Sequence, residues 1–276
     1  MFISNTIKTE VVTVTPEMAR KLLEQNTRNR KVSKGNYAQV LEAMTAGEWE
    51  LNGEAIKIAR DGTLLDGQHR CLVSAENDIP FQTLIVYGLP ANTQDTMDTG
   101  KSRSAADVLS IEGYPSANNL ASITIAIIRS ERWNLKAAVS TSNSFNAITP
   151  KQVLARVQEE PSLVDLSRYA TSVRKCGLSA KLSGVLFYHF SKIDQDDAEH
   201  FFNTLRDGEG LERGNPIHTL REQLLSLKNN VRGSANTAYL AAITIKAWNK
   251  YRLGEECRQL KYRPGGANPE KFPEAV

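Results

Sequence analysis

Over residues 1–113, short β-branched apolar runs alternate with segments whose apolar residues recur every three to four positions. The first pattern is typical of strands, and the second is typical of helices with one buried face. Strands are expected at residues 7–14, 55–59, 63–65 and 81–87. Helices are expected at residues 16–25, 34–46, 72–77, 92–97 and 105–109.

The ends of these elements carry local signals. Thr15-Pro16-Glu17 combines a side-chain cap, a proline for the first helical position and an acid in the first turn. Ser33 is expected to cap the second helix, and Gly47 suits the left-handed residue beyond its end. Asp61-Gly62 lies between two strand-like runs and predicts a tight hairpin turn.

Residues 114–276 show helical patterns without convincing strand alternation. Residues 137–147 are small and rich in Ser and Asn, which predicts a loop. The tail, residues 262–276, contains three prolines and two glycines and is expected to be extended or loose. Helices are expected at residues 116–128, 150–157, 182–190, 198–205, 220–227 and 238–253. The fold class is therefore α+β, with a small mixed-sheet domain at residues 1–113 and an all-helical domain at residues 114–276.

The composition narrows the function classes only slightly. The 276 residues are 41% hydrophobic and 24% charged, as in ordinary globular proteins. No apolar run reaches the length of a membrane span, and Met1–Asn5 does not begin a secretory signal, so we expect a cytoplasmic protein without membrane contact. The net charge of +3 permits nucleic-acid binding without implying it. Three separated cysteines and four histidines show no spacing that favours disulfides or zinc.

The residues with the most chemistry lie together in Asp66-Gly67-Gln68-His69-Arg70, between the apolar pair Leu64-Leu65 and an apolar helical run. This order predicts a strand, a tight turn and a helix start. A helix start presents free N–H groups and favours anions, and a glycine lets a ligand approach the backbone. His69 and Arg70 add donors, and Asp66 can bind a metal or take a proton. We therefore expect a phosphate site, although a polar turn in which Asp66 simply pairs with Arg70 is nearly as consistent with the pattern.

Other candidates near this turn have ordinary explanations as well. In a hairpin, Glu54 and Asp66 emerge at opposite ends, and they converge only if the chain before Glu54 folds back; otherwise Glu54 is a surface residue. Arg28 and Arg30 lie in a loop between two helices, where guanidinium groups suit phosphate oxygens but exposed arginines are equally common. Cys71 follows Arg70, yet the start of an apolar helix favours a packed, inert thiol.

A second polar cluster, Asp98–Arg103, contains Gly-Lys-Ser. A Walker A loop is rejected, because Asp95 stands where the first loop glycine belongs and no strand directly precedes the cluster. Thr99, Lys101 and Arg103 still precede a helix and can contact an anion. Solvated charges at a capped helix start explain them equally well.

The Asp66–Arg70 run, after a strand hairpin and before a helix, resembles the signature of the ParB/sulfiredoxin-like superfamily. The resemblance extends over about residues 8–110 and includes the segments at residues 26–30 and 98–103. It is strongest with the ParB N-terminal-like proteins that carry a D-G-Q-H-R motif, which occur in phages, plasmids and DNA-modification loci. It implies a small domain whose turn holds nucleotide phosphates.

Members of this superfamily differ at the turn. Sulfiredoxins have a nucleophilic cysteine where this chain has Gln68, and Cys71 lies on the wrong side of the His-Arg pair, which argues against that activity. Chromosome-partition ParB proteins have G-E-R-R and bind CTP, whereas here His69 replaces the first arginine. Free serine kinases have D-G-H-H-R, with the aspartate near the phosphoryl-accepting hydroxyl. By that resemblance Asp66 lies at the reacting group, and Glu54 is a candidate for the base.

The resemblance thus implies a nucleotide-binding protein with ATP or CTP and Mg²⁺ as ligands, acting as an NTPase or phosphotransferase in phage or plasmid DNA metabolism or modification. The implied catalytic residues are Asp66, His69 and Glu54, and Asp66 is also the implied metal ligand. The residues implied to hold the phosphates are Gly67, Gln68, His69, Arg70, Arg28, Arg30, Thr99, Lys101 and Arg103.

Two alternatives stay open. The first is a non-catalytic DNA-binding protein of partition or regulatory type, suggested by the loci of such relatives and by a basic set near the C-terminus (Arg252, Arg258, Lys261 and Arg263). The second is a nuclease, although no paired-acid motif favours it. The sequence also leaves open whether the chain forms a homodimer.

Overall fold

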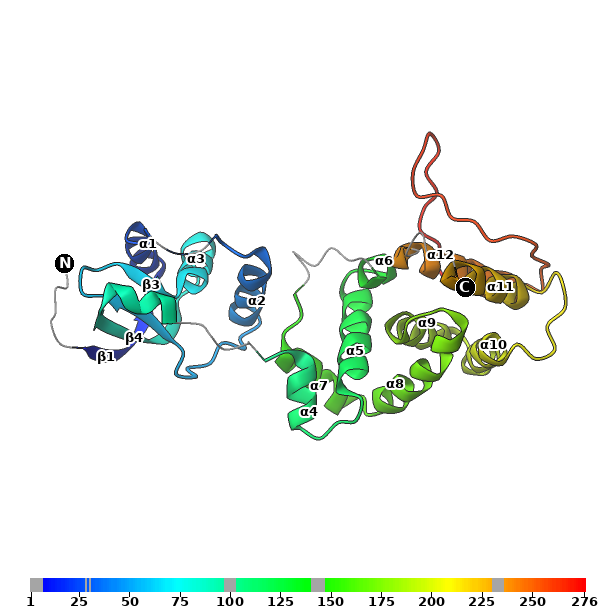
Figure 1. The fold of residues 1–276 in the computed structure, drawn as a ribbon, viewed down its shortest axis with the longest axis horizontal. Coiled ribbons are helices and arrows are strands. Elements are labelled where there is room, and N and C mark those ends of the chain that lie inside the picture. Colours follow the sequence, from blue (N-terminus) through cyan, green and yellow to red (C-terminus); the bar gives the residue numbers. More distant parts are fainter. Residues whose placement is uncertain (1–6, 28, 30, 97–102, 140–146, 230–235) are drawn as a thin grey trace. The chain divides into compact units, whose positions relative to one another are not determined.

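The computed structural model describes residues 7–27, 29, 31–96, 103–139, 147–229 and 236–276 (Figure 1). These residues form an α+β protein with one small mixed sheet and many helices. Contacts divide the chain into two compact units. Unit 1 comprises Met1–Ser102 and Asn143–Lys151, and unit 2 comprises Arg103–Ser142 and Gln152–Val276.

The described part of unit 1 contains a four-stranded sheet in the order β1-β4-β2-β3. Its strands are β1 (Lys8–Val14), β2 (Ala55–Ala59), β3 (Leu64–Asp66) and β4 (Phe81–Leu89). β1 pairs antiparallel with β4, and β2 pairs antiparallel with β3, while β2 and β4 run parallel. Parallel neighbours need a long crossover, and here β3 and the helix after it supply that connection. All four expected strands are present.

The helices of unit 1 are α1 (Pro16–Glu24), α2 (Lys34–Thr45) and α3 (Gln68–Asn77), followed by the 3₁₀ helix η1 (Ala91–Thr96). The expected caps form: Thr15 Oγ1 accepts from the Met18 N–H at 3.2 Å, and Ser33 Oγ accepts from the Asn36 N–H at 3.3 Å. The core of the unit joins one face of the sheet to α1 and α3, with Ile56, Leu64 and Ile85 among its buried residues. This packing fixes the start of α3 against β2 and β3.

In the described residues of unit 2, all regular secondary structure is helical. Its helices are α4 (Ala105–Ile111), α5 (Ala117–Arg132), α6 (Leu135–Val139), α7 (Pro150–Glu159, whose first two residues belong to unit 1), α8 (Ser162–Ser172), η2 (Val173–Cys176), α9 (Ala180–Ile193), α10 (Gln195–Asp207), α11 (Pro216–Asn229) and α12 (Thr237–Arg252). The core lies around α9, where the Phe190 ring stacks on Trp248 at 4.4 Å between centroids. None of the helices in the described ranges has both the length and the apolar character needed to span a membrane.

Three features of the helical half differ from the sequence-based expectation. The segment Ala105–Ile111 was expected in the first domain, but as α4 it belongs to unit 2 and packs on α5. The loop expected from residue 137 begins later, because α6 continues to Val139 and buries Ala138. The helix α8 was not predicted. Polar residues separate its apolar positions, and it is helical because it packs on α9.

The tail after α12 has no helix or strand, as expected, but it is not loose. Trp248 Nε1 donates to the carbonyl of Val276 at 3.0 Å, and Asn249 Nδ2 donates to the carbonyl of Glu274 at 2.8 Å. Arg252, one of the basic residues near this end, forms ion pairs with Asp194 and Asp197. Its charge is therefore compensated within unit 2.

Candidate functional site

The turn at Asp66–Arg70 connects the hairpin β2–β3 to α3. β3 ends at Asp66, Gly67 takes the left-handed conformation with φ 104°, and α3 begins at Gln68. No side chain caps the first turn of this ten-residue helix. Its N-terminal N–H groups therefore produce the positive potential that favours an anion at this position.

Gly67 is required here for two separate reasons. Its positive φ is a conformation that side chains disfavour, and an added Cβ would lie 2.8 Å from Cγ1 of Ile56. The turn therefore passes against β2 at a distance that only glycine permits. This close approach places the start of α3 beside the first residues of β2.

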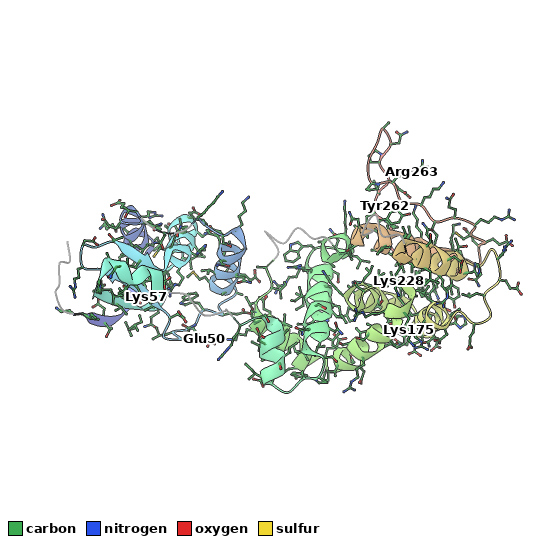
Figure 2. All side chains as sticks on the ribbon, viewed as in Figure 1. Glu50, Lys57, Lys175, Lys228, Tyr262 and Arg263 are labelled. Atoms are coloured by element: carbon green, nitrogen blue, oxygen red, sulfur yellow. The ribbon has the colours of Figure 1, made fainter. Side chains whose placement is uncertain are left out.

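Asp66 is held by three groups of the protein. Its Oδ1 accepts from the Gly67 N–H at 2.6 Å, and its Oδ2 lies 2.9 Å from Lys57 Nζ and 3.8 Å from Arg70 Nη2. Lys57 projects from β2 in unit 1 (Figure 2), and the Asp66 side chain is only 18% exposed. The carboxylate is thus fixed in place beside two cations, as a positioned acid or ligand requires.

Arg70 uses its guanidinium within the protein as well. Nη1 donates to the carbonyl of Glu54 at 2.9 Å, and Nη2 donates to the carbonyl of Ala55 at 2.8 Å. The fork therefore attaches the first turn of α3 to the beginning of β2. Its charge remains next to the turn, but its primary contacts are structural.

The antiparallel register pairs Lys57 with Asp66, so the start of β2 and the end of β3 lie at the same end of the hairpin, and the expectation that Glu54 and Asp66 emerge at opposite ends was wrong. Both residues line the same cavity. The Glu54 carbonyl accepts from Arg70 and from Thr83 Oγ1 at 3.0 Å, which anchors this segment between α3 and β4. The Glu54 side chain itself is exposed. The two carboxylates that the sequence proposed for chemistry are thereby brought together at one site.

His69 connects this site to α2. Its Nε2 accepts from the backbone N–H of Ser33, the capping residue of α2, at 3.0 Å. Because Nε2 is the acceptor, the neutral ring carries its proton on Nδ1. The bond fixes the orientation of the imidazole and the position of the N-terminus of α2 relative to α3.

These elements surround a cavity of about 300 Å³. The turn forms one wall, α2 forms another, and the segment before β2 forms the third. Besides the turn residues, the lining consists of Asn36, Gln39, Val40, Trp49, Asn52 and Glu54. Trp49 is held in place, because its Nε1 donates to the carbonyl of Gln82 at 2.8 Å and its ring meets Phe81 edge-on. The result is an amide-rich pocket with one anchored aromatic ring.

Gln68 is the most informative residue in this cavity. It is 9% exposed and lines the pocket, yet within the described residues its side-chain amide has no hydrogen-bond partner. Its amide atoms are not among the fully buried polar atoms that lack a partner, so they reach the open space of the cavity. This amide, at the N-terminus of a helix, is therefore available to a polar ligand.

Several expected phosphate contacts lie elsewhere or cannot be placed. Arg28, Arg30, Thr99 and Lys101 lie outside the described residues, and Arg103 is an exposed residue of unit 2. Asn29 is described: its Nδ2 donates to the carbonyl of Leu64 at 2.7 Å. Asn29 therefore lies beside β3.

Cys71 is fully buried, and burial raises the pKa of its thiol to about 12, a shift that the nearby charge of Arg70 opposes only partly. It is the packed, inert cysteine that the apolar helix start favoured. Among the described residues, no three His, Cys, Asp or Glu side chains gather into a metal site. Metal binding at Asp66 would thus depend on Glu54 and on ligand oxygens.

Sequence reasoning missed Lys57 and the pocket residues from α2 and the segment before β2. Lys57 did carry a signal, because a lysine inside the apolar strand Ala55–Ala59 needs a partner. Asn36, Gln39, Trp49 and Asn52 carried none, since ordinary helix and loop patterns accommodate them. No protein-family model, curated protein or solved structure matches this chain.

Proposed function

We propose that unit 1 is a ParB/sulfiredoxin-like domain that binds ATP or CTP with Mg²⁺ in the cavity at Asp66–Arg70, and that the chain is an NTPase or phosphotransferase. The observation that carries the proposal is Gln68 at the start of α3, whose amide reaches the cavity and has no protein partner. A phosphate oxygen at this position would accept hydrogen bonds from the amide and from the first N–H groups of the helix.

The charges of the lining support a metal-bound phosphate over a bare one. The cavity is lined by two carboxylates, Glu54 and Asp66, and by one permanent cation, Arg70. Lys57, 2.9 Å from Asp66, balances the second carboxylate, so a bare triphosphate would meet no net positive charge. Mg²⁺ binds through one or two carboxylates together with phosphate oxygens, so Glu54 and Asp66 fit a nucleotide that enters with its metal.

The remaining walls suit a nucleoside. Trp49 offers an anchored ring for stacking, and Asn36 and Gln39 offer amides that can donate and accept. A cavity of about 300 Å³ lies at the small end of ligand pockets. It accommodates part of a nucleotide, so the rest of the ligand would extend beyond it.

Phosphoryl transfer needs positioning and charge stabilisation more than covalent assistance. The bound metal would supply the main neutralisation of phosphate charge. Asp66 is already oriented by Lys57 and the Gly67 N–H, which suits a residue that positions or deprotonates a nucleophile. His69 adds an imidazole whose orientation is set by Ser33.

The direct test is isothermal titration of the full chain with ATP, CTP and GTP in the presence of Mg²⁺, and again with EDTA. We expect at least one nucleotide to bind, and chelation to abolish binding. Absence of binding by all three nucleotides would refute the proposal.

The diagnostic variant is Gln68→Glu, which keeps the shape of the side chain but places a negative charge against the phosphates. An acid also suits the first turn of a helix, so the fold should be retained. We expect the affinity to fall about tenfold or more. The matched control is Gln82→Glu, an exposed position on β4 outside the cavity. Equal affinities of the two variants would remove the site from this cavity.

Asp66→Asn separates an enzyme from a binder. If the chain hydrolyses nucleotide, this variant should lose release of inorganic phosphate, whereas nucleotide binding should weaken only in part, because Glu54 remains as a carboxylate ligand for the metal. Arg70→Ala is a poorer choice, because it also releases the carbonyls of Glu54 and Ala55 that position β2.

A further inference from the structure

β1 is an edge strand of the sheet (Figure 1), and its one neighbouring strand in the sheet of the described residues is β4. It pairs with β4 from Lys8↔Tyr87 to Val14↔Phe81 without a bulge. Within the described residues, no other segment forms hydrogen bonds with its outer edge. The edge therefore presents a regular row of N–H and C=O groups over the length of the strand.

This edge contains no proline and no bulge, and its residues are mostly β-branched. Residues 8–11 are exposed, and Ile7 and Val11 have 56% and 53% of their surface exposed. Lys8 and Glu10 are charges of the kind that oppose pairing with an unrelated strand. A regular, exposed edge with these charges can therefore pair only with a strand whose charges match them.

The two faces of β1 differ in character. Val12 and Val14 face the core. Lys8 and Glu10 lie on the same face of the strand, because alternate residues share a face. The opposite face carries Ile7, Thr9 and Val11, with Val11 paired to Leu84 on β4. Leu84 and Val86 are half-buried there, so an apolar strip runs from β4 to the edge of the sheet.

The order of residues in β1 is complementary to itself. If two β1 strands pair antiparallel with Thr9 opposite Thr9, each Lys8 faces the Glu10 of the other strand, and each Ile7 faces the other Val11. Directly opposite residues in antiparallel strands point to the same face, so both charge pairs lie on one face and both apolar pairs lie on the other. Centring the pair on Glu10 instead would place like charges opposite each other.

We propose that β1 pairs with β1 of a second copy of this chain about a two-fold axis at Thr9, which joins two sheets into one. The pairing is isologous, so each favourable contact occurs twice. It also extends the apolar strip of Leu84 and Val11 onto the second copy. The proposal is independent of nucleotide binding, because the cavity is lined by other elements.

The test is sedimentation velocity of the full chain at rising concentration, up to about 500 µM, since small interfaces associate weakly. We expect the apparent mass to rise from 30.6 kDa towards twice that value. A chain that stays monomeric throughout this range would overturn the proposal. That result is the one expected if unit 2 or another segment covers the edge.

Charge reversal tests the register. Lys8→Glu places two carboxylates opposite each other, and Glu10→Lys places two ammonium groups opposite each other. Each should weaken dimerisation about tenfold or more, because symmetry counts each substitution twice. Combining Lys8→Glu with Glu10→Lys restores opposite charges and should restore the dimer.

The matched control is Lys34→Glu, which makes the same charge change at an exposed position on α2. It should dimerise like the unmodified chain, and thermal melting should show that all variants remain folded. If Lys8→Glu dimerises normally, or if the double variant is not rescued, the proposed pairing of β1 is wrong.

Discussion

Lys57 on β2 and Asp66 on β3 are directly opposite cross-strand neighbours, and Lys57 Nζ lies 2.9 Å from Asp66 Oδ2. Their side chains are 26% and 18% exposed. The pair therefore lies in partly desolvated surroundings at the base of the candidate site. The pair orients Asp66, the residue whose substitution distinguishes an enzyme from a protein that only binds nucleotide.

Lys57→Met should lower the free energy of unfolding of unit 1 by about 1–2 kcal/mol, because it leaves a half-buried carboxylate with only its longer contact to Arg70. The control is Lys21→Met, which breaks a fully exposed pair with Glu17 and should have a much smaller effect. Urea-dependent hydrogen exchange, read on peptides from β2 to α3, measures both. Similar losses would show that the Lys57–Asp66 pair has no special role.

Gly67→Ala should destabilise unit 1 by about 3 kcal/mol or more, since it adds a contact of 2.8 Å with Ile56 to the strain of a positive φ. Gly62→Ala separates these two effects. Gly62 also has a positive φ, but nothing lies within 4 Å of an added Cβ, so only strain of about 1 kcal/mol is expected. The same exchange experiment gives both values, and equal costs would contradict the close packing of the turn.

The stability of unit 2 should fall as the pH drops below about 6.5, because burial, assisted by the charge of Lys192 and opposed by Glu131, lowers the pKa of His189. The unfolded chain then binds a proton at a pH where the folded chain does not, so acid favours unfolding. In the fold, His189 Nε2 lies 2.7 Å from Ser130 Oγ. Calorimetry between about pH 7 and pH 5 should show a decreasing melting temperature.

His189→Gln removes the titrating group and retains a hydrogen-bonding partner for Ser130, so it should flatten this part of the pH profile. His200→Gln is the control, because His200 is exposed on α10. A profile of the His189→Gln variant that still matches the original chain would assign the pH dependence to other groups.

Much of unit 1 was predictable because its signals are local. Thr15 and Ser33 cap helices through side-chain bonds to residues three positions ahead, and Asp61-Gly62 closes a hairpin between adjacent strands. The turn before α3 was predictable for the same reason, as a strand, a glycine and a helix start in succession. In unit 2, α8 escaped prediction because its helicity depends on packing against α9.

The composition of the candidate site was not predictable in the same way. A simple Asp66–Arg70 pair was the alternative to a phosphate site, but the closer cation to Asp66 is Lys57, and Arg70 mainly binds the carbonyls of Glu54 and Ala55. The cavity walls come from α2 and from the segment before β2, which lie apart from the turn in the sequence. A sequence pattern shows which residues are close along the chain, whereas the residues that line this cavity are far apart along the chain.

The sequence by itself determined that Asp66–Arg70 is a turn between a strand and a helix, because backbone propensities and glycine act over a few residues. Only the tertiary structure decided which of its side chains face the cavity. Gln68, expected as one phosphate contact among nine, became the central residue because folding brings its amide to the cavity without giving it a protein partner. Burial and hydrogen-bond satisfaction depend on the whole fold, and for that reason they cannot be read from a local pattern.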